Sequence, residues 1–483
     1  MAQRATTITG EVDETGTRHR LEAAFARIRD ELAAPGDFPP DALADAERAA
    51  ADPDLPRRDE TALPLCTIDP PGSMDLDQAL HIARDGAGYR VRYAIADVPA
   101  FVRPGSALDE EARRRGQTIY CPDTRVPLHP AVMSEDAASL LPGQARPAFV
   151  WDVRLDADGA RDVAEVYRAV VRSRRRYTYE EVQQQVDTGS AEEPLLLLRE
   201  VGRLRVQRES DRGGASLPMP SQEVHVDGDG HYRLRRRPLR EAEDWNAQIS
   251  LLTGMVAAEI MLEGGIGILR TMPAPSQRDV DRFRRQARAL GAAWPEGMAY
   301  GDFLRTLDWQ DPAHLAIIHD ATALFRGAGY TPFDGAPPTD PAHTVQAALA
   351  APYAHVTAPL RRLVDRFGLV ACAALTAGQE VPDWVRAALP ELPPIMQRSE
   401  QLARTVDRAC TDAVEAAALQ HRVGERFRAV VVDRAGDRGV VVQVTDPAVT
   451  ARADGEAALG AEVAVELVRA DVTGHEVRFA VLD

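Results

Sequence analysis

The sequence predicts an α+β protein, in which an antiparallel β core packed with helices is preceded by a short helical segment and followed by a small β-barrel. Three observations indicate this order. Apolar residues have helical spacing near the N-terminus, strand patterns begin near residue 63 and give way to helices, and the tail from 424 consists of short strand patterns. We therefore divide the 483 residues into segments 1–62, 63–422 and 423–483.

The N-terminal segment is predicted to form two helices. Leu21, Phe25, Ile28 and Leu32 recur at helical spacing, and the stretch PGDFPP separates them from a shorter Ala-rich helix that ends near Ala51. Two arrangements remain open at this point. The helices form a separate helix-turn-helix-like module, or, as we favour, a helical pair packed on the main domain.

The second segment begins with strands. Residues 81–98 predict an antiparallel hairpin, because apolar residues alternate on both sides of a turn at Asp85 and Gly86. Residues 146–155 and 164–173 predict two further strands. These strands form the predicted β core.

Helices follow this core. Thr178 and Glu181 form a capping-box pattern at the start of the helix YEEVQQQV, and residues 243–420 are predicted to be mostly helical.

The tail contains five short strand patterns separated by Gly and Asp turns, which is typical of a small barrel of the oligonucleotide-binding type. Its only aromatic residues are Phe427 and Phe479, a poor platform for stacking bases. An RNA-binding barrel and a capping barrel with little direct RNA affinity therefore have equal support.

Composition narrows the class of protein. The chain has no lysine, so all 57 basic residues are arginine, and its net charge of −17 argues against a surface coated in nucleic acid while allowing a local arginine-lined channel. Arginine in place of lysine, with abundant Ala, Gly and Pro, weakly indicates a bacterial origin. Apolar runs of membrane-spanning length, a signal-peptide core and C-x-x-C pairs are absent from the sequence. We expect a cytoplasmic protein with no membrane contact and no organic cofactor, and favour a monomer.

The stretch TIDPPGSMDLDQAL, residues 67–80, crowds three aspartates into nine residues. Asp75 and Asp77 share a face on an extended segment, and Asp69 precedes a Pro-Pro-Gly-Ser turn. Carboxylate oxygens are the ligands that Mg²⁺ or Mn²⁺ prefers. A metal-binding cup and a solvated acidic loop both remain open on these residues alone.

Five segments in order resemble the catalytic RNB domain of the ribonuclease II and ribonuclease R family. They are TIDPPGSMDLDQAL, YAIADVPAFVRPGSALDEEA, TIYCPDTRVPLHPAVMSEDAASLLPGQARPA, RSRRRYTYEEV and VTAPLRRLVDR. The terminal barrel also stands where this family has an RNA-binding barrel. The resemblance covers residues 63–483.

The resemblance implies a 3′-to-5′ exoribonuclease that hydrolyses single-stranded RNA to nucleoside 5′-monophosphates with Mg²⁺, or Mn²⁺ in its place. It implies Asp77 and Arg361 as catalytic residues. The implied metal ligands are Asp69, Asp75, Asp77 and Gln78, and the implied RNA-binding residues are Tyr120, Tyr179, Arg361, Arg362 and Asp407. Two alternatives stay open: a non-catalytic RNA-binding member with a decayed metal site, and a metal-dependent phosphodiesterase acting on DNA.

The sequence departs from the family pattern at several points. Gln78 stands where a fourth acid belongs, so we expect weaker binding of one metal. Residues 1–62 are too few for the paired cold-shock barrels of the usual layout, so we expect tolerance of structured RNA with a 3′ overhang. An aromatic is missing near Pro218 and Met219, and Asn246 lies where an acidic segment is expected.

The arginine clusters at 172–176 and 235–237 line an RNA channel or form a solvated face, with even support for both.

Overall fold

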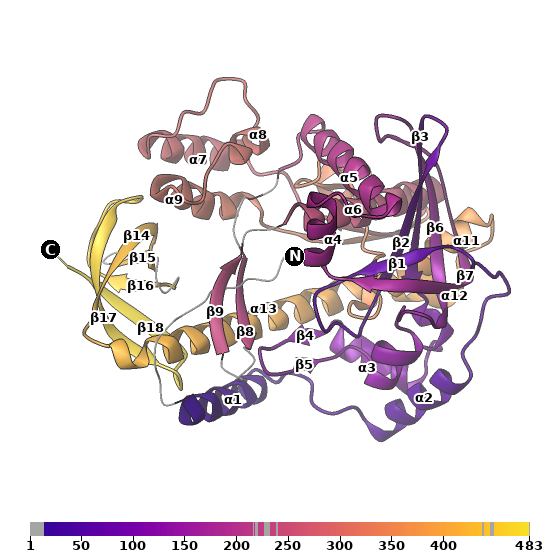
Figure 1. Ribbon diagram of the computed structural model, residues 1–483, viewed down its shortest axis with the longest axis horizontal. Coiled ribbons are helices and arrows are strands. Elements are labelled where there is room, and N and C mark those ends of the chain that lie inside the picture. Colours follow the sequence, from indigo (N-terminus) through magenta and orange to yellow (C-terminus); the bar gives the residue numbers. More distant parts are fainter. Residues whose placement is uncertain are drawn as a thin grey trace.

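The computed structural model describes residues 14–215, 217, 221–226, 232–237, 240–436, 439–444 and 449–482 (Figure 1). Its first β core is a closed barrel with the strand order β1-β2-β3-β6-β7. Neighbouring strands are antiparallel except β1 and β7, which run parallel and close the barrel. The strands are β1 (Leu65–Ile68), β2 (Gln78–Asp85), β3 (Gly88–Ala96), β6 (Ala145–Leu155) and β7 (Arg161–Tyr177).

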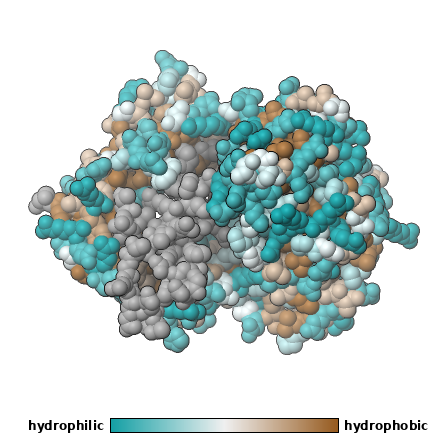
Figure 2. Space-filling view, in the orientation of Figure 1, coloured by the Kyte–Doolittle hydropathy of each residue, from teal (hydrophilic) through white to brown (hydrophobic). Residues whose placement is uncertain are grey.

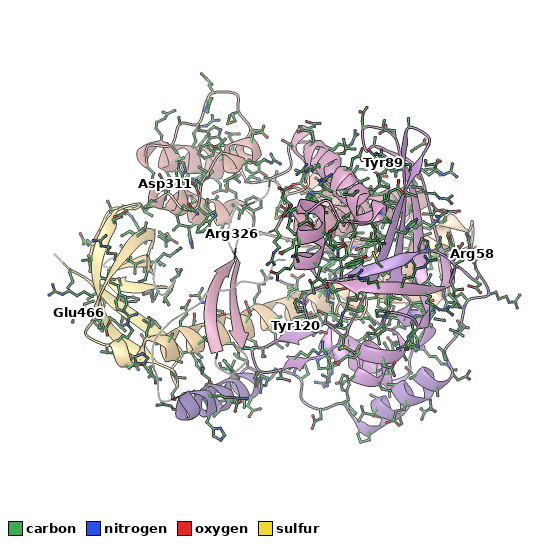
Figure 3. All side chains as sticks on the ribbon, viewed as in Figure 1. Arg58, Tyr89, Tyr120, Asp311, Arg326 and Glu466 are labelled. Atoms are coloured by element: carbon green, nitrogen blue, oxygen red, sulfur yellow. The ribbon has the colours of Figure 1, made fainter. Side chains whose placement is uncertain are left out.

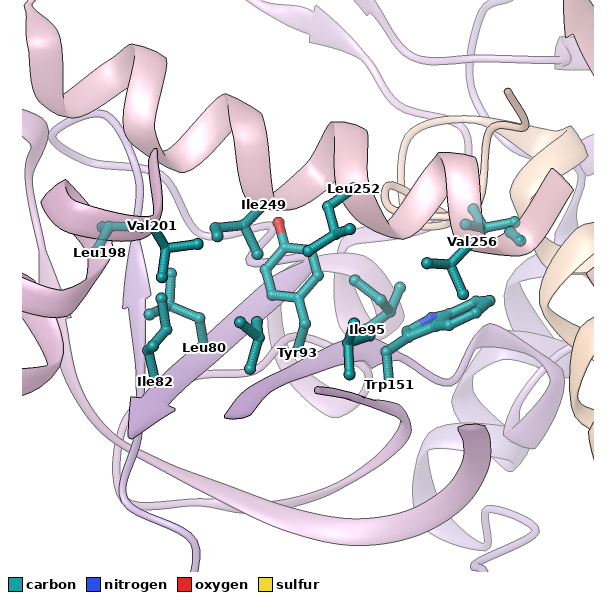
Figure 4. Packing of buried hydrophobic residues seen from close by; sticks show 14 of the residues in the cluster. Leu80, Ile82, Tyr93, Ile95, Trp151, Leu198, Val201, Ile249, Leu252 and Val256 are labelled. Carbon is teal, nitrogen blue, oxygen red and sulfur yellow. The ribbon is translucent and has the colours of Figure 1, made fainter. Parts of the chain in front are cut away.

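The predicted hairpin is confirmed as β2 and β3, with Asp85 paired to Gly88 at its turn. Apolar side chains of β3 and β6 pack against helix α6 (Glu241–Gly264), as Figure 4 shows for Tyr93 and Trp151 beside Ile249, Leu252 and Val256. Burial of these side chains fixes the strand register, because a shift by one residue would turn the apolar set toward water.

Helices lie around the first barrel and beside the second (Figure 1). They are α3 (Ala107–Arg115), α4 (Tyr179–Asp187), α5 (Glu193–Asp211), α7 (Gln277–Ala289), α8 (Tyr300–Arg305), α9 (Pro312–Ala321), α10 (Pro341–Thr344), α11 (Leu363–Thr376), α12 (Asp383–Ala388) and α13 (Leu392–Leu419). The capping box at Thr178 and Glu181 is confirmed at the start of α4. Helix α13 crosses the molecule toward the C-terminal barrel (Figure 1).

Segment 243–420 is less purely helical than predicted. Short strand pairs interrupt it, because Gly265 ends α6 in a left-handed conformation and the following residues IGILRT enter a strand. The short pairs of the molecule are β4 (Ile119–Tyr120) with β5 (Arg125–Val126), β8 (Ser221–Val226) with β9 (Tyr232–Arg237), β10 (Ile266–Thr271) with β11 (Gly329–Asp334), and β12 (Val345–Gln346) with β13 (Ala351–Pro352).

The predicted tail strands are confirmed as a second closed barrel, ordered β14-β15-β16-β18-β17. Its strands are β14 (Arg426–Arg434), β15 (Gly439–Val444), β16 (Thr450–Asp454), β17 (Glu462–Asp471) and β18 (Glu476–Val481). Phe427 and Phe479 are both buried and pack edge to face with ring centroids 5.7 Å apart. Both aromatics therefore belong to the barrel core and are not positioned to stack on bases.

The two N-terminal helices pack on different parts of the molecule. Helix α1 (Glu14–Glu31) lies along α13 and buries Leu21, Phe25 and Ile28 with it and the second barrel, whereas α2 (Pro40–Ala51) packs on α3. The two helices are thus joined to the body of the protein instead of forming a helix-turn-helix pair.

On the face shown in Figure 2, hydrophilic side chains cover much of the described surface and hydrophobic ones appear in scattered groups. Within the described residues, no helix is both long and apolar enough to cross a membrane.

Candidate active site

The acidic stretch forms the loop between β1 and β2, and both ends of the loop are anchored on the barrel. The backbone N–H of Asp69 donates to the carbonyl oxygen of Tyr177 at 3.0 Å, where β7 ends. Gly72 turns the chain with φ of 80°, a conformation that favours glycine. The carbonyl oxygen of Asp77 accepts from the N–H of Ala96 at 2.9 Å. The loop therefore holds its aspartates at one end of the barrel.

Asp75 is held by the β4–β5 hairpin. Its carboxylate accepts from Nη1 of Arg125 at 2.8 Å and from the hydroxyl of Tyr120 at 3.4 Å. Tyr120 and Arg125 face each other across the hairpin, so one short element supplies both partners. Sequence reasoning singled out Tyr120 but missed Arg125, whose pairing with Tyr120 depends on the turn between them.

Asp77 is buried, with 4% of its surface exposed. Its Oδ1 accepts from the N–H of Leu360 at 2.8 Å, and its Oδ2 lies 3.4 Å from Nε of Arg361. Burial raises the pKa of Asp77 well above its usual value, against the opposing effects of Arg361 and the Leu360 bond, while the nearby Asp75 raises it further.

Asp69 completes the carboxylate group. Its Oδ2 is buried and has no hydrogen-bond partner among the described residues. Burial raises the pKa of Asp69 to about 7, an effect that Arg361 opposes and Asp75 reinforces. Asp75 is thus close enough to Asp69 and Asp77 to disfavour the ionisation of both, as expected where a cation or protons must relieve repulsion.

The chemical type of the donor atoms in the acidic loop suits a hard divalent cation. The donor set combines three carboxylates with the amide oxygen of Gln78, and among the described residues the buried Oδ2 of Asp69 has no hydrogen-bond partner. The arrangement itself does not converge on one point, since no three His, Cys, Asp or Glu side chains within the described ranges are gathered at ligand spacing. Asp75 and Asp77 are instead turned toward Arg125 and Arg361.

Gln78 is the first residue of β2. Its Nε2 donates to the carbonyl oxygen of Thr357 at 2.5 Å, which ties the acidic loop to the segment that carries Arg361. The amide nitrogen is therefore engaged, and the oxygen is the atom of this side chain that can bind a cation. A carboxylate at this position would lose the bond to Thr357.

The two neighbouring arginines have different surroundings. Arg361 has a half-exposed side chain that contacts Asp77. Arg362 forms a two-pronged pair with the buried carboxylate of Asp365, at 2.5 and 2.7 Å, at the start of α11. Asp365 also accepts from the N–H of Ala358 at 2.7 Å, so this pair shapes the turn that presents Arg361. RNA contact by Arg362 stays a prediction that its pairing does not support.

The two candidate stacking residues border the carboxylates. The side chain of Tyr120 is exposed, and Figure 3 places it in the central part of the molecule. Tyr179 is the first residue of α4, directly after the capping box, and its hydroxyl accepts from Nδ2 of Asn246 at 3.3 Å. Burial raises the pKa of Tyr179 to about 12, and the neighbouring Asp69 acts in the same direction.

The remaining predicted residues are more dispersed. Asp407 lies on an exposed part of α13, and its role stays a prediction. In the 172–176 cluster, Nη1 of Arg176 donates to the carbonyl oxygen of Ser73 at 2.6 Å and braces the acidic loop. The side chains of 235–237, together with Pro218 and Met219, lie outside the described residues.

The raised pKa of Asp69 predicts a pH-dependent stability in protein stripped of divalent cations. The folded state keeps the proton up to about pH 7, whereas the unfolded chain releases it near pH 3.9, so the free energy of unfolding should fall as pH rises between these values. Asp69→Asn should reduce the decline between pH 5 and 8 by about 2 kcal/mol, allowing for partial exposure. Urea denaturation in chelator measures it, and identical pH slopes in the two proteins would contradict the assignment.

Comparison with known proteins identifies both barrels. Residues 57–368 match the family described as RNB domain, and residues 425–482 match the RNase II-type exonuclease C-terminal S1 domain. A probable exosome complex exonuclease RRP44 of Caenorhabditis elegans is 30% identical over 331 residues, covering 64% of this chain and 34% of the relative. The chain thus spans about a third of the length of that relative.

Solved structures show the same fold at low identity. Mycoplasma genitalium RNase R, in complex with ribose methylated single-stranded RNA, superposes with a TM-score of 0.84 at 18% identity, over 96% of this chain and 78% of that one. Yeast Ssd1, described as a pseudonuclease, superposes with a TM-score of 0.66 at 17% identity, over 88% of this chain and 54% of that one. The fold is therefore common to a ribonuclease and to a protein described as inactive.

Proposed function

The chain belongs to the RNB-domain family, and on that premise we propose that it is a 3′-to-5′ exoribonuclease that hydrolyses single-stranded RNA to nucleoside 5′-monophosphates. One observation carries the proposal. Asp69, Asp75 and Asp77 come from one loop and Arg361 from a segment far along the sequence, yet Asp77 contacts Arg361 and Asp75 raises the pKa of both other aspartates. This juxtaposition supports chemistry on a phosphodiester.

Hydrolysis of a phosphodiester needs an activated water and stabilisation of negative charge on the phosphate oxygens. Asp69, Asp75, Asp77 and Gln78 would hold Mg²⁺, or Mn²⁺ in its place, which supplies the charge and the water activation. Arg361 is half exposed, always charged and oriented by Asp77, so it is placed to donate to a phosphate oxygen. Asp77 would thus bind the cation and orient the arginine.

Two tyrosines are suited to bind RNA by stacking on its bases independently of sequence. The exposed ring of Tyr120 and the ring of Tyr179, which lies near Asp69, provide aromatic faces on which any base can stack. Their hydrogen bonds to Asp75 and from Asn246 hold these rings near the carboxylates. Processing of one nucleotide after another requires such sequence-independent contacts.

A non-catalytic RNA-binding role is the second candidate, because the same fold occurs in a protein described as a pseudonuclease. The three aspartates and Arg361 favour the catalytic proposal, since a binding module has no need of carboxylates that repel RNA phosphates. A phosphodiesterase acting on DNA is the third candidate.

One experiment separates the three candidates. Single-stranded RNA and DNA of the same sequence are incubated with the full chain in Mg²⁺ or in chelator, and bound and released nucleotides are measured. Release of nucleoside 5′-monophosphates from RNA only, and only with Mg²⁺, is the expected result. Binding of RNA without release would support the non-catalytic candidate, and equal cleavage of DNA would support the third.

Gln78→Glu tests the neutral fourth ligand. The added carboxylate should lower the Mg²⁺ concentration for half-maximal RNA turnover about tenfold, because a charged oxygen binds the cation more strongly. Without metal, the variant should lose about 1–3 kcal/mol of unfolding free energy, since an acceptor then faces the carbonyl of Thr357. Mg²⁺ titrations of turnover and of the melting temperature measure both effects. An unchanged Mg²⁺ requirement would remove Gln78 from the ligand set.

A further inference from the structure

Two of the four cysteines contact each other where three segments of the chain meet. Cys121 directly follows β4 in the β4–β5 hairpin, and Cys410 lies on α13, with 1% of its surface exposed. The hairpin strand β4 lies against α13, and Cys121 packs on the buried apolar cluster that contains Cys410, near enough for the two free thiols to interact. Cys121 is only partly buried, so small solutes reach its side of the pair.

The surroundings of Cys121 favour a reactive thiol. Arg29 at the end of α1 forms an ion pair of 2.7 Å with Asp123, which lies two residues after Cys121, so its guanidinium is close to this thiol. The neighbouring Cys410 thiol lowers the pKa of Cys121, desolvation opposes this effect, and the guanidinium of Arg29 lowers the pKa further. A thiolate beside an arginine is the reactive form of cysteine.

The other two cysteines lack these features. The thiols of Cys66 and Cys372 are buried, and each donates to a backbone carbonyl oxygen, that of Leu80 at 3.7 Å and that of Ala257 at 3.6 Å. Burial raises the pKa of both thiols. They are inert by comparison and serve as internal controls.

We propose that Cys121 and Cys410 form a redox modification site that closes to a disulfide with a hydroperoxide as oxidant. The Cys121 thiolate attacks one oxygen of hydrogen peroxide, so that an S–O bond forms, the O–O bond breaks and hydroxide leaves, which takes up the proton released by the Cys121 thiol and becomes water. The Cys410 sulfur then attacks the resulting sulfenic acid, the S–S bond forms, and the departing hydroxide takes the Cys410 proton as water. Two thiols lose two electrons in total, and hydrogen peroxide is reduced to two waters.

The disulfide has a direct route to the acidic loop. The sulfurs of two free thiols lie further apart than the about 2.05 Å of a disulfide, so closure pulls the hairpin toward Cys410, which is buried in a long helix. Tyr120 immediately precedes Cys121, and Arg125 pairs with Tyr120 across the hairpin. Both side chains hold the Asp75 carboxylate, so movement of the hairpin shifts Asp75.

Mass spectrometry of the full chain tests the site without reference to RNA. Trypsin cuts after Arg115, Arg125, Arg408 and Arg422, so Cys121 and Cys410 fall in separate peptides. After hydrogen peroxide and without reductant, a linked species of peptides 116–125 and 409–422 should appear, and it should vanish with dithiothreitol. Peroxide treatment that leaves the two peptides unlinked would overturn the proposal.

Cys→Ser variants test which two cysteines form the linkage. Cys410→Ser should leave Cys121 to accumulate as sulfenic and sulfinic acid, because no second thiol resolves it. Cys66→Ser and Cys372→Ser should give the same linked species as the wild type. Linkage that requires Cys66 or Cys372 would contradict the assignment of the pair.

The effect on turnover rests on the proposed function and is measured separately. Oxidised wild type should degrade RNA at least about tenfold more slowly, dithiothreitol should restore the rate, and Cys121→Ser should be insensitive to peroxide. Linkage without a change in rate would refute the route through Asp75. Absence of RNA degradation in reduced protein would refute the proposed function and leave the linkage test intact.

Discussion

Asp77→Asn should lower RNA turnover on the order of 10³-fold while leaving RNA binding and folding nearly unchanged. Asparagine keeps an oxygen that can accept from the N–H of Leu360, so the backbone contact survives. The charge that pairs with Arg361 and would bind the cation is lost. Because burial already disfavours ionisation of Asp77, removing the charge should cost little or no unfolding free energy.

Asp97→Asn is the matched control for this substitution. Asp97 is also fully buried, is paired with an arginine, Arg168, at 2.5 Å, and has a pKa that burial raises to about 6. It differs from Asp77 in lying outside the acidic loop, where its partner is Arg168 and not Arg361. Asp97→Asn should therefore leave turnover per folded molecule within about twofold of wild type. Single-turnover rates and urea denaturation of both variants test the contrast, which equal losses in turnover would contradict.

Arg361→Gln should mainly reduce RNA turnover, whereas Arg362→Gln, at the next residue, should mainly reduce the free energy of unfolding. Arg361→Gln should reduce turnover about 10²–10³-fold with little loss of stability, because its half-exposed guanidinium contacts only Asp77 among the described ion pairs. Arg362→Gln should cost about 3 kcal/mol of unfolding free energy, because it leaves the fully buried Asp365 carboxylate without its partner.

Measurement of turnover and of urea denaturation on both variants tests this separation. Turnover per folded molecule of Arg362→Gln should stay closer to wild type than that of Arg361→Gln. The reverse order, with Arg362→Gln the more damaging to chemistry, would show that Arg362 and not Arg361 meets the phosphate.

Local sequence patterns were enough to predict the elements whose signals lie close together in the sequence. The hairpin of β2 and β3, the capping box at Thr178 and the five tail strands could be predicted because their signals lie within a few residues of one another. The strands β10 and β11 were missed because about 60 residues of mostly helical pattern separate them, and pairing at that distance leaves no local periodicity.

The acidic residues of the candidate site could be singled out from the sequence, but the groups that contact them could not. Asp69, Asp75 and Asp77 fall in one short stretch, whereas the group that binds Asp77 is the backbone N–H of Leu360, which any residue but proline provides. The contact between Cys121 and Cys410 likewise depends on how α13 crosses the molecule. Residue type gave no sign that Arg361 and Arg362 would face different partners.

The central claim, hydrolysis of RNA from its 3′ end, is tested most directly by following one RNA labelled at its 5′ end. The RNA is supplied with a free 3′ hydroxyl or with a blocked 3′ end, and incubated with the full chain and Mg²⁺. The proposal predicts that the labelled strand shortens in single-nucleotide steps and that nucleoside 5′-monophosphates appear from the first time point, only with the free 3′ end. Early release of the labelled 5′ nucleotide, or internal fragments from both RNAs, would contradict it.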